Sequence, residues 1–162
     1  MKNKNILFMT QAAMIAAIYV VITILFAPFG FGEIQVRISE ALTILPYFTP
    51  AAIPGLFLGC LIGNVIGGAI LPDIIFGSLA TLVGAIGTFL LRKKSKFWAP
   101  IPPILANAIV VPYVLRYAYS RPLPIPFMML TVGIGEIISC GVIGMILLGT
   151  LQKYQNKIFR NK

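Results

Sequence analysis

The 162-residue chain has no histidine, four acidic residues, two cysteines and a single tryptophan. Without histidine it lacks the commonest general base and the usual zinc ligand. Cys60 and Cys140 lie far apart in apolar segments and form no CxxC motif, so we interpret both as small packing residues. The lack of a paired thiol or an acidic metal cluster argues against an enzyme. We therefore expect no catalytic residue, no metal and no cofactor in this chain.

Charged residues are also scarce, at 10% of the chain, whereas soluble domains are charged at about a quarter of their positions. Hydrophobic residues make up 59%, and the mean hydropathy is +0.95. This composition predicts an integral membrane protein. Thirteen basic residues give a net charge of +9, and all but Arg37, Arg116 and Arg121 lie in the two tails and one loop. That distribution is typical of positive-inside loops and not of a nucleic-acid-binding face.

Long apolar segments fill most of the chain, and a membrane-spanning helix needs about 20 such residues. We predict an all-α, polytopic six-helix bundle in a single domain, 1–162, with helices at about 5–27, 37–48, 50–70, 73–91, 99–118 and 124–150. The second segment is short, so we expect it to be tilted, incomplete or packed inside the bundle. Lys2 and Lys4 precede the first segment without a small-residue cleavage site, which favours a retained helix over a signal peptide.

Six spans would place both termini on one side of the membrane. The basic residues near the N-terminus, from Arg92 to Lys96, and in the tail from Lys153 would then share a face. The positive-inside rule makes that face cytoplasmic. We expect a multi-pass plasma-membrane protein with both termini in the cytoplasm, anchored at the lipid interface by Phe97 and Trp98.

The densest polar stretch between the tails is Gln35-Val36-Arg37-Ile38-Ser39-Glu40-Ala41-Leu42-Thr43. Two interpretations of it remain open. Arg37 and Glu40 are either an i,i+3 pair at a helix start, with Glu40 near the positive end of the helix dipole, or groups that face a cavity and bind a ligand.

Other polar residues need explanation because a charge inside the membrane costs at least about 2.5–3.5 kcal/mol. Glu136 lies about ten residues into the last segment, roughly 15 Å deep at ~1.5 Å per residue. It either binds a ligand or pairs with Arg116 or a neighbouring helix. Asn107 can donate and accept together, which suits the edge of a heterocycle or an interhelical bond. Asn64 either packs between helices or belongs to the binding site. Arg116 either anchors the helix at the lipid interface or belongs to the binding site.

The two remaining acids have simpler expected roles. Asp73 follows Pro72 at a helix start, where we expect it to cap free backbone N–H groups. Glu33 lies in the first outer loop, as a solvated residue or part of a lid.

Five polar residues could converge in the outer half of the bundle and form a ligand pocket. Such a pocket would suit a cation or a small ligand rich in N–H donors. The residues are Glu40, Asn64, Asn107, Arg116 and Glu136.

Small residues recur at a spacing of four on two segments. The first carries Ala12, Ala13, Ala16 and Ala17, and the third carries Gly55, Gly59, Gly63 and Gly67. Such rows allow helices to approach closely. For the glycines we expect packing within the bundle, and for the alanines either packing or the docking of a partner.

Three blocks of the sequence together resemble the QueT family, the substrate-binding (S) components of energy-coupling factor (ECF) transporters. The resemblance covers nearly the whole chain. It is strongest in an RxSEALT block, a glycine-rich block that includes Gly63-Asn64, and a DxxxGSxAT block, at residues 36–43, 53–68 and 73–81.

This resemblance implies the capture of a queuosine precursor, most simply the 7-deazaguanine preQ1, from outside the cell. It implies that the alanine ridge docks on a transmembrane coupling subunit and that the first, third and fifth loops close over the site. Two separate ATPase subunits would use the ATP, since this chain has no GxxxxGK[ST] loop. Glu40 and Glu136 would divide the N–H edge and the cationic aminomethyl group between them, with Asn107 on the carbonyl side. The alternatives are a self-sufficient permease and an S component for another vitamin.

Overall fold

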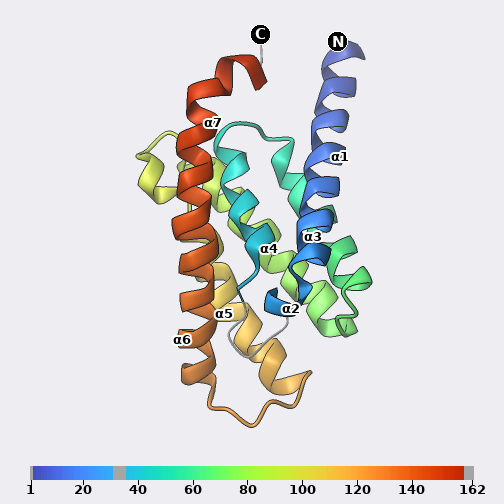
Figure 1. The fold of residues 1–162 in the computed structure, drawn as a ribbon, viewed down its shortest axis with the longest axis vertical. Coiled ribbons are helices and arrows are strands. Elements are labelled where there is room, and N and C mark those ends of the chain that lie inside the picture. Colours follow the sequence, from blue (N-terminus) through green and yellow to red (C-terminus); the bar gives the residue numbers. More distant parts are fainter. Residues whose placement is uncertain (1, 31–35, 159–162) are drawn as a thin grey trace.

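The structure, a computed structural model, describes residues 2–30 and 36–158. Within these ranges every regular element is a helix, which confirms the all-α class. The elements are α1 (Lys2–Leu25), α2 (Ala27–Gly30), η1 (Ile38–Tyr47), α3 (Ala52–Ile66), α4 (Leu71–Leu91), η2 (Lys96–Trp98), α5 (Ile101–Tyr117), α6 (Ile125–Glu136), η3 (Ile137–Ile143) and α7 (Gly144–Ile158) (Figure 1).

Four of the six expected segments are long and apolar enough to cross a membrane. They are Lys4–Leu25, Leu71–Leu91, Lys96–Tyr117 and Ile125–Tyr154. The other two are the shorter apolar helix α3 and the ten-residue η1. Large apolar side chains point outward along the long helices, as expected where lipid is the solvent. The fold is that of a polytopic membrane bundle.

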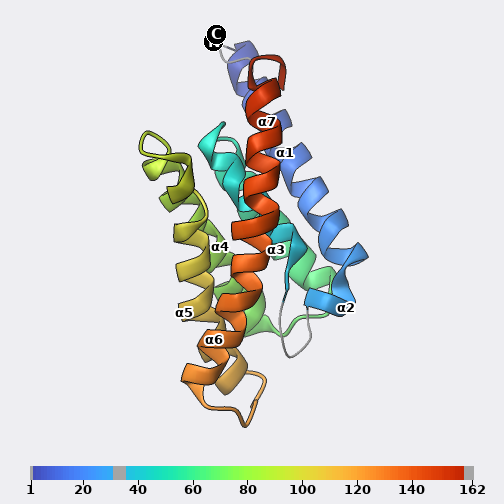
Figure 2. The same ribbon diagram turned by 60° about the vertical axis from the view of Figure 1, so that its left-hand side comes forward.

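The short second segment lies inside the bundle. It forms a 3₁₀ helix, and eight of its ten residues, Ser39 to Pro46, are buried. It contacts α1, α4, η3 and α7, and it runs between α1 and the rod formed by α6 and α7 (Figures 1 and 2). Of the three arrangements expected for this segment, packing within the bundle is the one observed. Its position places Glu40 at the centre of the molecule.

The glycine row of α3 packs against α1, as expected. A Cβ atom added at Gly55 would lie 2.7 Å from the carbonyl oxygen of Ala12, and one at Gly59 would lie 2.8 Å from Cβ of Tyr19. The two backbones can be this close only because these positions have no side chain. The same contact uses Ala12 and Ala16, so these two alanines follow the packing alternative. Ala13 and Ala17 are exposed, and docking of a partner on the alanine ridge stays a prediction.

The last segment is a continuous rod in which α6 passes through a π-helical stretch, η3, into α7. Single π-helical turns of this kind are frequent at functional sites. Gly144, at the start of α7, allows the rod to approach η1, because a Cβ there would lie 3.2 Å from Ile44 Cγ2. The close approach brings Glu136 and Cys140 next to Glu40.

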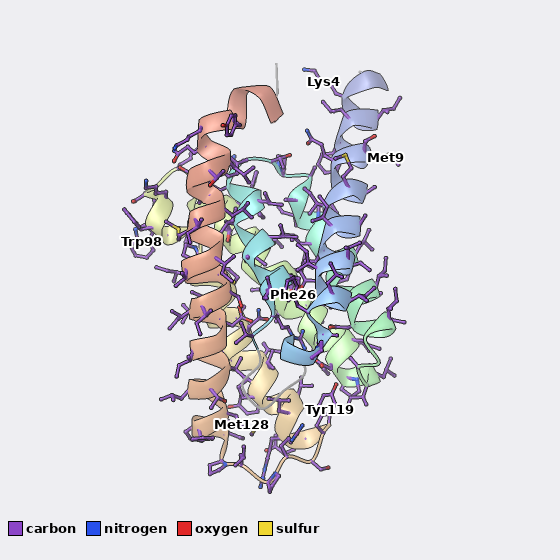
Figure 3. The ribbon with its side chains drawn as sticks, viewed as in Figure 1. Lys4, Met9, Phe26, Trp98, Tyr119 and Met128 are labelled. Atoms are coloured by element: carbon purple, nitrogen blue, oxygen red, sulfur yellow. The ribbon has the colours of Figure 1, made fainter. Side chains whose placement is uncertain are left out.

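The described ends of the chain lie at the same end of the bundle (Figures 1 and 2). Lys4 and Trp98 lie toward that end, whereas Tyr119 and Met128 lie toward the other (Figure 3). This arrangement is the one expected for an even number of passes. The assignment of the end with the termini to the cytoplasm stays a prediction.

Candidate functional site

All three acidic residues in the described ranges are buried in the bundle. Glu40, Asp73 and Glu136 are each no more than 3% exposed. Burying a carboxylate in an apolar bundle is costly unless hydrogen bonds or a positive charge compensate it. These residues are therefore the natural starting point for a site.

Glu40, on η1, receives hydrogen bonds from two other helices. Its Oε1 accepts one from the hydroxyl of Tyr19 on α1 and one of 3.0 Å from Oγ1 of Thr81 on α4. Its second oxygen, Oε2, is buried and has no hydrogen-bond partner among the described residues. One side of this carboxylate is thus held in place while the other remains available.

Glu136 lies at the end of α6, beside Glu40. Its Oε1 accepts a 3.1 Å hydrogen bond from Nδ2 of Asn107 on α5, and its Oε2 accepts one of 3.2 Å from Sγ of Cys140. The Cys140 thiol also lies 3.3 Å from the backbone oxygen of Glu40. One carboxylate oxygen from each glutamate and the Cys140 sulfur all lie within 4.8 Å of one another. We call Glu40, Glu136, Asn107 and Cys140 the acidic cluster.

Two carboxylates at this separation repel each other unless a proton or a cation lies with them. Their side-chain partners are two hydroxyls, an amide and a thiol, none of which carries a positive charge. Arg37, which the first interpretation paired with Glu40, is instead 3.3 Å from Asp73. The acidic cluster is therefore suited to a ligand that brings positive charge or several N–H donors.

A second polar group centres on Asp73 and lies toward the end of the bundle opposite the chain termini (Figure 3). Its Oδ2 pairs with Nη2 of Arg37 and accepts a 3.0 Å hydrogen bond from the Tyr119 hydroxyl. The same hydroxyl accepts a 3.4 Å hydrogen bond from the backbone N–H of Ile70. Burial, and then the Asp73 charge, raise the pKa of Tyr119 above its ordinary value. Arg37 precedes η1, Asp73 lies in the first turn of α4 and Tyr119 follows α5. We call these three residues the outer clasp, because this end of the bundle is the one predicted to face outside.

Asn64 connects the outer clasp with the acidic cluster. Its Oδ1 lies 3.5 Å from Nη1 of Arg37, and its Nδ2 lies 3.6 Å from Sγ of Cys60. The Cys60 sulfur in turn lies 3.4 Å from Oγ1 of Thr81, the residue that donates to Glu40. Polar contacts therefore run from the outer clasp to the acidic cluster.

The structure brings together five of the six predicted site residues. Glu40, Glu136 and Asn107 are in the acidic cluster, while Arg37 and Asn64 lie in the polar chain above it. Arg116 is not with them: it is exposed, and its Nη1 donates to the backbone oxygen of Arg121. It lies in the last turn of α5 on the outward face, so it reaches neither Glu136 nor the interior.

The expected local roles of two charged residues are wrong. Arg37 has extended backbone before η1, so its side chain lies toward Asp73 and not along the helix toward Glu40. The Asp73 carboxylate caps no backbone N–H: Oδ2 binds Arg37 and Tyr119, and Oδ1 has no partner in the described chain. Long-range partners replaced the short-range ones in both cases. Glu33 lies outside the described residues.

Sequence reasoning missed Tyr19, Thr81, Tyr119 and Cys140. Tyr19 is a lone phenol in an apolar span, and nothing local distinguishes it from an interfacial aromatic residue. Cys140 carried a usable signal, because it follows Glu136 by four residues and so lies one turn further along the same face. Thr81 is the last residue of the DxxxGSxAT block, so the motif indicates that this residue matters. The motif does not indicate that Thr81 binds Glu40.

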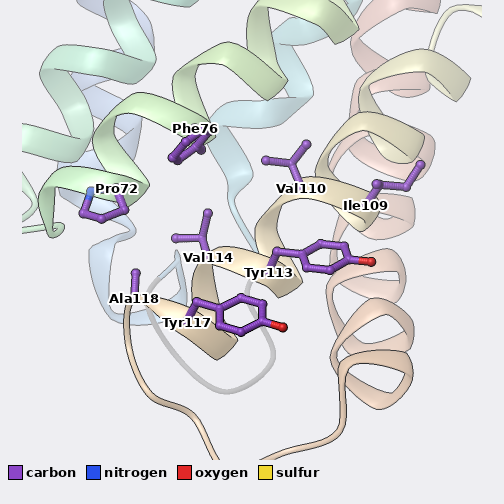
Figure 4. Close-up of a pocket in the computed structure, with 8 residues that line it drawn as sticks. All are labelled: Pro72, Phe76, Ile109, Val110, Tyr113, Val114, Tyr117 and Ala118. Carbon is purple, nitrogen blue, oxygen red and sulfur yellow. The ribbon is translucent and has the colours of Figure 1, made fainter.

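An apolar groove of about 490 Å³ also opens between α4 and α5 (Figure 4). It shares no lining residue with the acidic cluster or the outer clasp. Its lining is almost entirely apolar, which does not suit a polar ligand, and consists of Pro72, Phe76, Ile109, Val110, Tyr113, Val114, Tyr117 and Ala118.

Together, the fold and the site define a polytopic helical membrane protein with a buried, acidic polar interior. A family model described as QueT transporter matches residues 9–153. The chain belongs to the QueT transporter family, as its sequence blocks predicted.

A curated relative, the queuosine precursor transporter QueT of Lactococcus lactis subsp. cremoris (strain MG1363), is 32% identical over 103 residues. The aligned stretch covers 60% of this chain and 60% of that relative. No solved structure matches the chain significantly.

Proposed function

We propose that this chain is the substrate-binding S component of an ECF transporter and that it captures a queuosine precursor, most simply preQ1, from outside the cell. The observation that carries the proposal is the acidic cluster: two buried carboxylates within reach of one ligand, with Glu40 Oε2 unpaired in the described chain. The family membership and the printed name of the relative support the choice of ligand class.

The chemistry of preQ1 matches this cluster. A 7-deazaguanine presents adjacent N–H donors on its pyrimidine edge, which one carboxylate can accept in a pair, and its aminomethyl group is a cation. Glu40 and Glu136 would divide these roles, and the Asn107 amide would turn to the ring carbonyl. The ligand charge would also relieve the repulsion between the two glutamates.

Uptake would require partners that supply energy. In this proposal the chain docks on an ECF transmembrane coupling subunit, and two ATPase subunits hydrolyse ATP. Of the alanines in the expected docking ridge, Ala13 and Ala17 are exposed and would contact the coupling subunit. Both termini would lie on the cytoplasmic side of the plasma membrane, where the coupling module acts.

Binding of preQ1 to the purified protein, followed by calorimetry, tests the site. Glu40→Gln and Glu136→Gln should each weaken binding at least about tenfold, since a charge-assisted hydrogen bond contributes about 1.5–3 kcal/mol. Arg116→Gln is the control, because its side chain lies outside the polar chain. Unchanged affinity in both glutamate variants would remove the assignment.

Uptake by proteoliposomes separates the S component from a self-sufficient permease. The proposal expects uptake only when the coupling module and ATP are present, and uptake by this chain alone would favour the permease. Oligomerisation of a permease through the α3 glycines is not supported, because α1 covers that face.

A further inference from the structure

The acidic cluster contains a set of atoms that the proposed function does not use fully. We infer that Glu40, Glu136 and Cys140 form a binding site for a thiophilic divalent metal ion of the Zn²⁺ and Cd²⁺ class. The three residues come from η1, α6 and η3, and their candidate ligand atoms lie within 4.8 Å of one another. All three are buried, so the site differs from the exposed acidic groups common on protein surfaces.

The geometry is close to that of a three-ligand zinc site. Tetrahedral oxygen and sulfur ligands at about 2.0–2.3 Å from Zn²⁺ are about 3.3–3.6 Å from one another. Cys140 Sγ is already 3.2 Å from Glu136 Oε2. A small inward movement of the remaining atoms would complete the three-ligand set and leave the fourth position open.

The hydrogen bonding of Glu40 also points to a cation here. Glu40 Oε2 is fully buried and has no hydrogen-bond partner in the described ranges, although the opposite oxygen has two. Leaving such an oxygen without a partner is costly, and a cation bound to it would remove that cost.

The surrounding residues would orient the metal ligands. The Asn107 amide holds one oxygen of Glu136, while Tyr19 and Thr81 hold one oxygen of Glu40. Hydrogen bonds of this kind to the second oxygen of a carboxylate ligand are typical around metal ions. Thiolate and carboxylate together select zinc-like metals over Mg²⁺ or Ca²⁺, which prefer oxygen alone.

Binding would release two protons to solvent. One is the thiol proton of Cys140, which leaves as the sulfur–metal bond forms, and the other is the proton that the two glutamates share when no cation is bound; two carboxylates, one thiolate and a divalent ion then leave a net charge of −1 at the site. The overlap with substrate rests on the proposed function: the metal would occupy the carboxylates that bind the aminomethyl cation, so metal and preQ1 would exclude each other.

Titration of the purified, ligand-free full chain with Cd²⁺ tests the site, with cadmium–thiolate absorbance in the ultraviolet as the readout. We expect one Cd²⁺ per chain. Cys140→Ala and Cys140→Ser should abolish the absorbance, Cys60→Ala should retain it, and Glu136→Gln should weaken binding at least tenfold. Circular dichroism checks that each variant is folded. Absorbance that survives in both folded Cys140 variants, or that is absent from the unsubstituted protein, overturns the inference.

A second arm adds preQ1 to the same protein. Displacement of Cd²⁺ by preQ1, with release of the absorbance, supports a shared site. Cd²⁺ binding that needs Cys140 in a protein with no affinity for preQ1 leaves the metal site standing and removes the proposed function. If the protein binds preQ1 but gives no Cd²⁺ absorbance, the proposed function stands and the metal site is removed.

Discussion

The contact between α1 and α3 allows a strict test of how the bundle supports its site. In Gly59→Ala the new Cβ would lie 2.8 Å from Tyr19 Cβ and 3.1 Å from Ala16 Cα, whereas carbon atoms pack best at about 3.5–4.0 Å. The helices would have to separate by roughly 0.7 Å or more to remove this overlap. Such overpacking costs about 1–3 kcal/mol, and the better helix propensity of alanine returns up to about 1 kcal/mol.

With the full offset the net loss is about 0–2 kcal/mol, which lowers the melting temperature by up to about 8 °C at roughly 2–4 °C per kcal/mol. A thiol-reactive fluorogenic dye reports unfolding in detergent, because Cys60 and Cys140 are both buried and free. Since Tyr19 holds Glu40, binding of preQ1 should weaken as well.

Gly149→Ala is the matched control. A Cβ at that position meets nothing within 4 Å, so this variant should melt at the same temperature or slightly higher. The reasoning is refuted if Gly59→Ala melts no lower than Gly149→Ala. A lower melting temperature with unchanged ligand affinity would refute only the link from the helix contact through Tyr19 to the site.

The other predictions concern charged and phenolic groups. Because burial and the Asp73 charge raise the pKa of Tyr119 from 10.0, its stabilising effect is complete below about pH 10 and is lost as the pH rises through the folded pKa. Tyr119→Phe should therefore make unfolding less dependent on pH in that alkaline range, and equal slopes would contradict this. Asp73→Asn should lower the melting temperature more than Arg116→Gln, since it removes the buried ion pair between Asp73 and Arg37. Equal melting temperatures would show that the outer clasp adds no stability.

The outer clasp is relevant to the prediction that the loops at this end close over the site, because its residues lie beside those loops. Arg37 follows the first outer segment, Asp73 begins α4 after the α3–α4 connection, and Tyr119 follows α5. The Asp73 carboxylate thus holds two side chains, those of Arg37 and Tyr119, which come from different parts of the chain.

Much of the site could be predicted because acidic residues are rare. In a chain with four of them, Glu40 and Glu136 stand out without any knowledge of the fold, and depth along a span suggested that Glu136 lies inside. The same method failed for Arg116, because distance along a helix says nothing about which side of it faces the interior. It failed for Cys140 because a thiol in an apolar segment resembles ordinary packing.

Composition and periodic small residues determined the membrane class, the helical fold and the close packing of α3, since these properties depend on averages and on spacing within one element. The tertiary structure decided which side chains meet. Arg37 pairs with Asp73, which is 36 residues away in the sequence. Glu40 accepts hydrogen bonds from Tyr19 and Thr81, which are 21 and 41 residues away. Such pairings depend on how helices approach and rotate against one another, and no local pattern in the chain encodes that geometry.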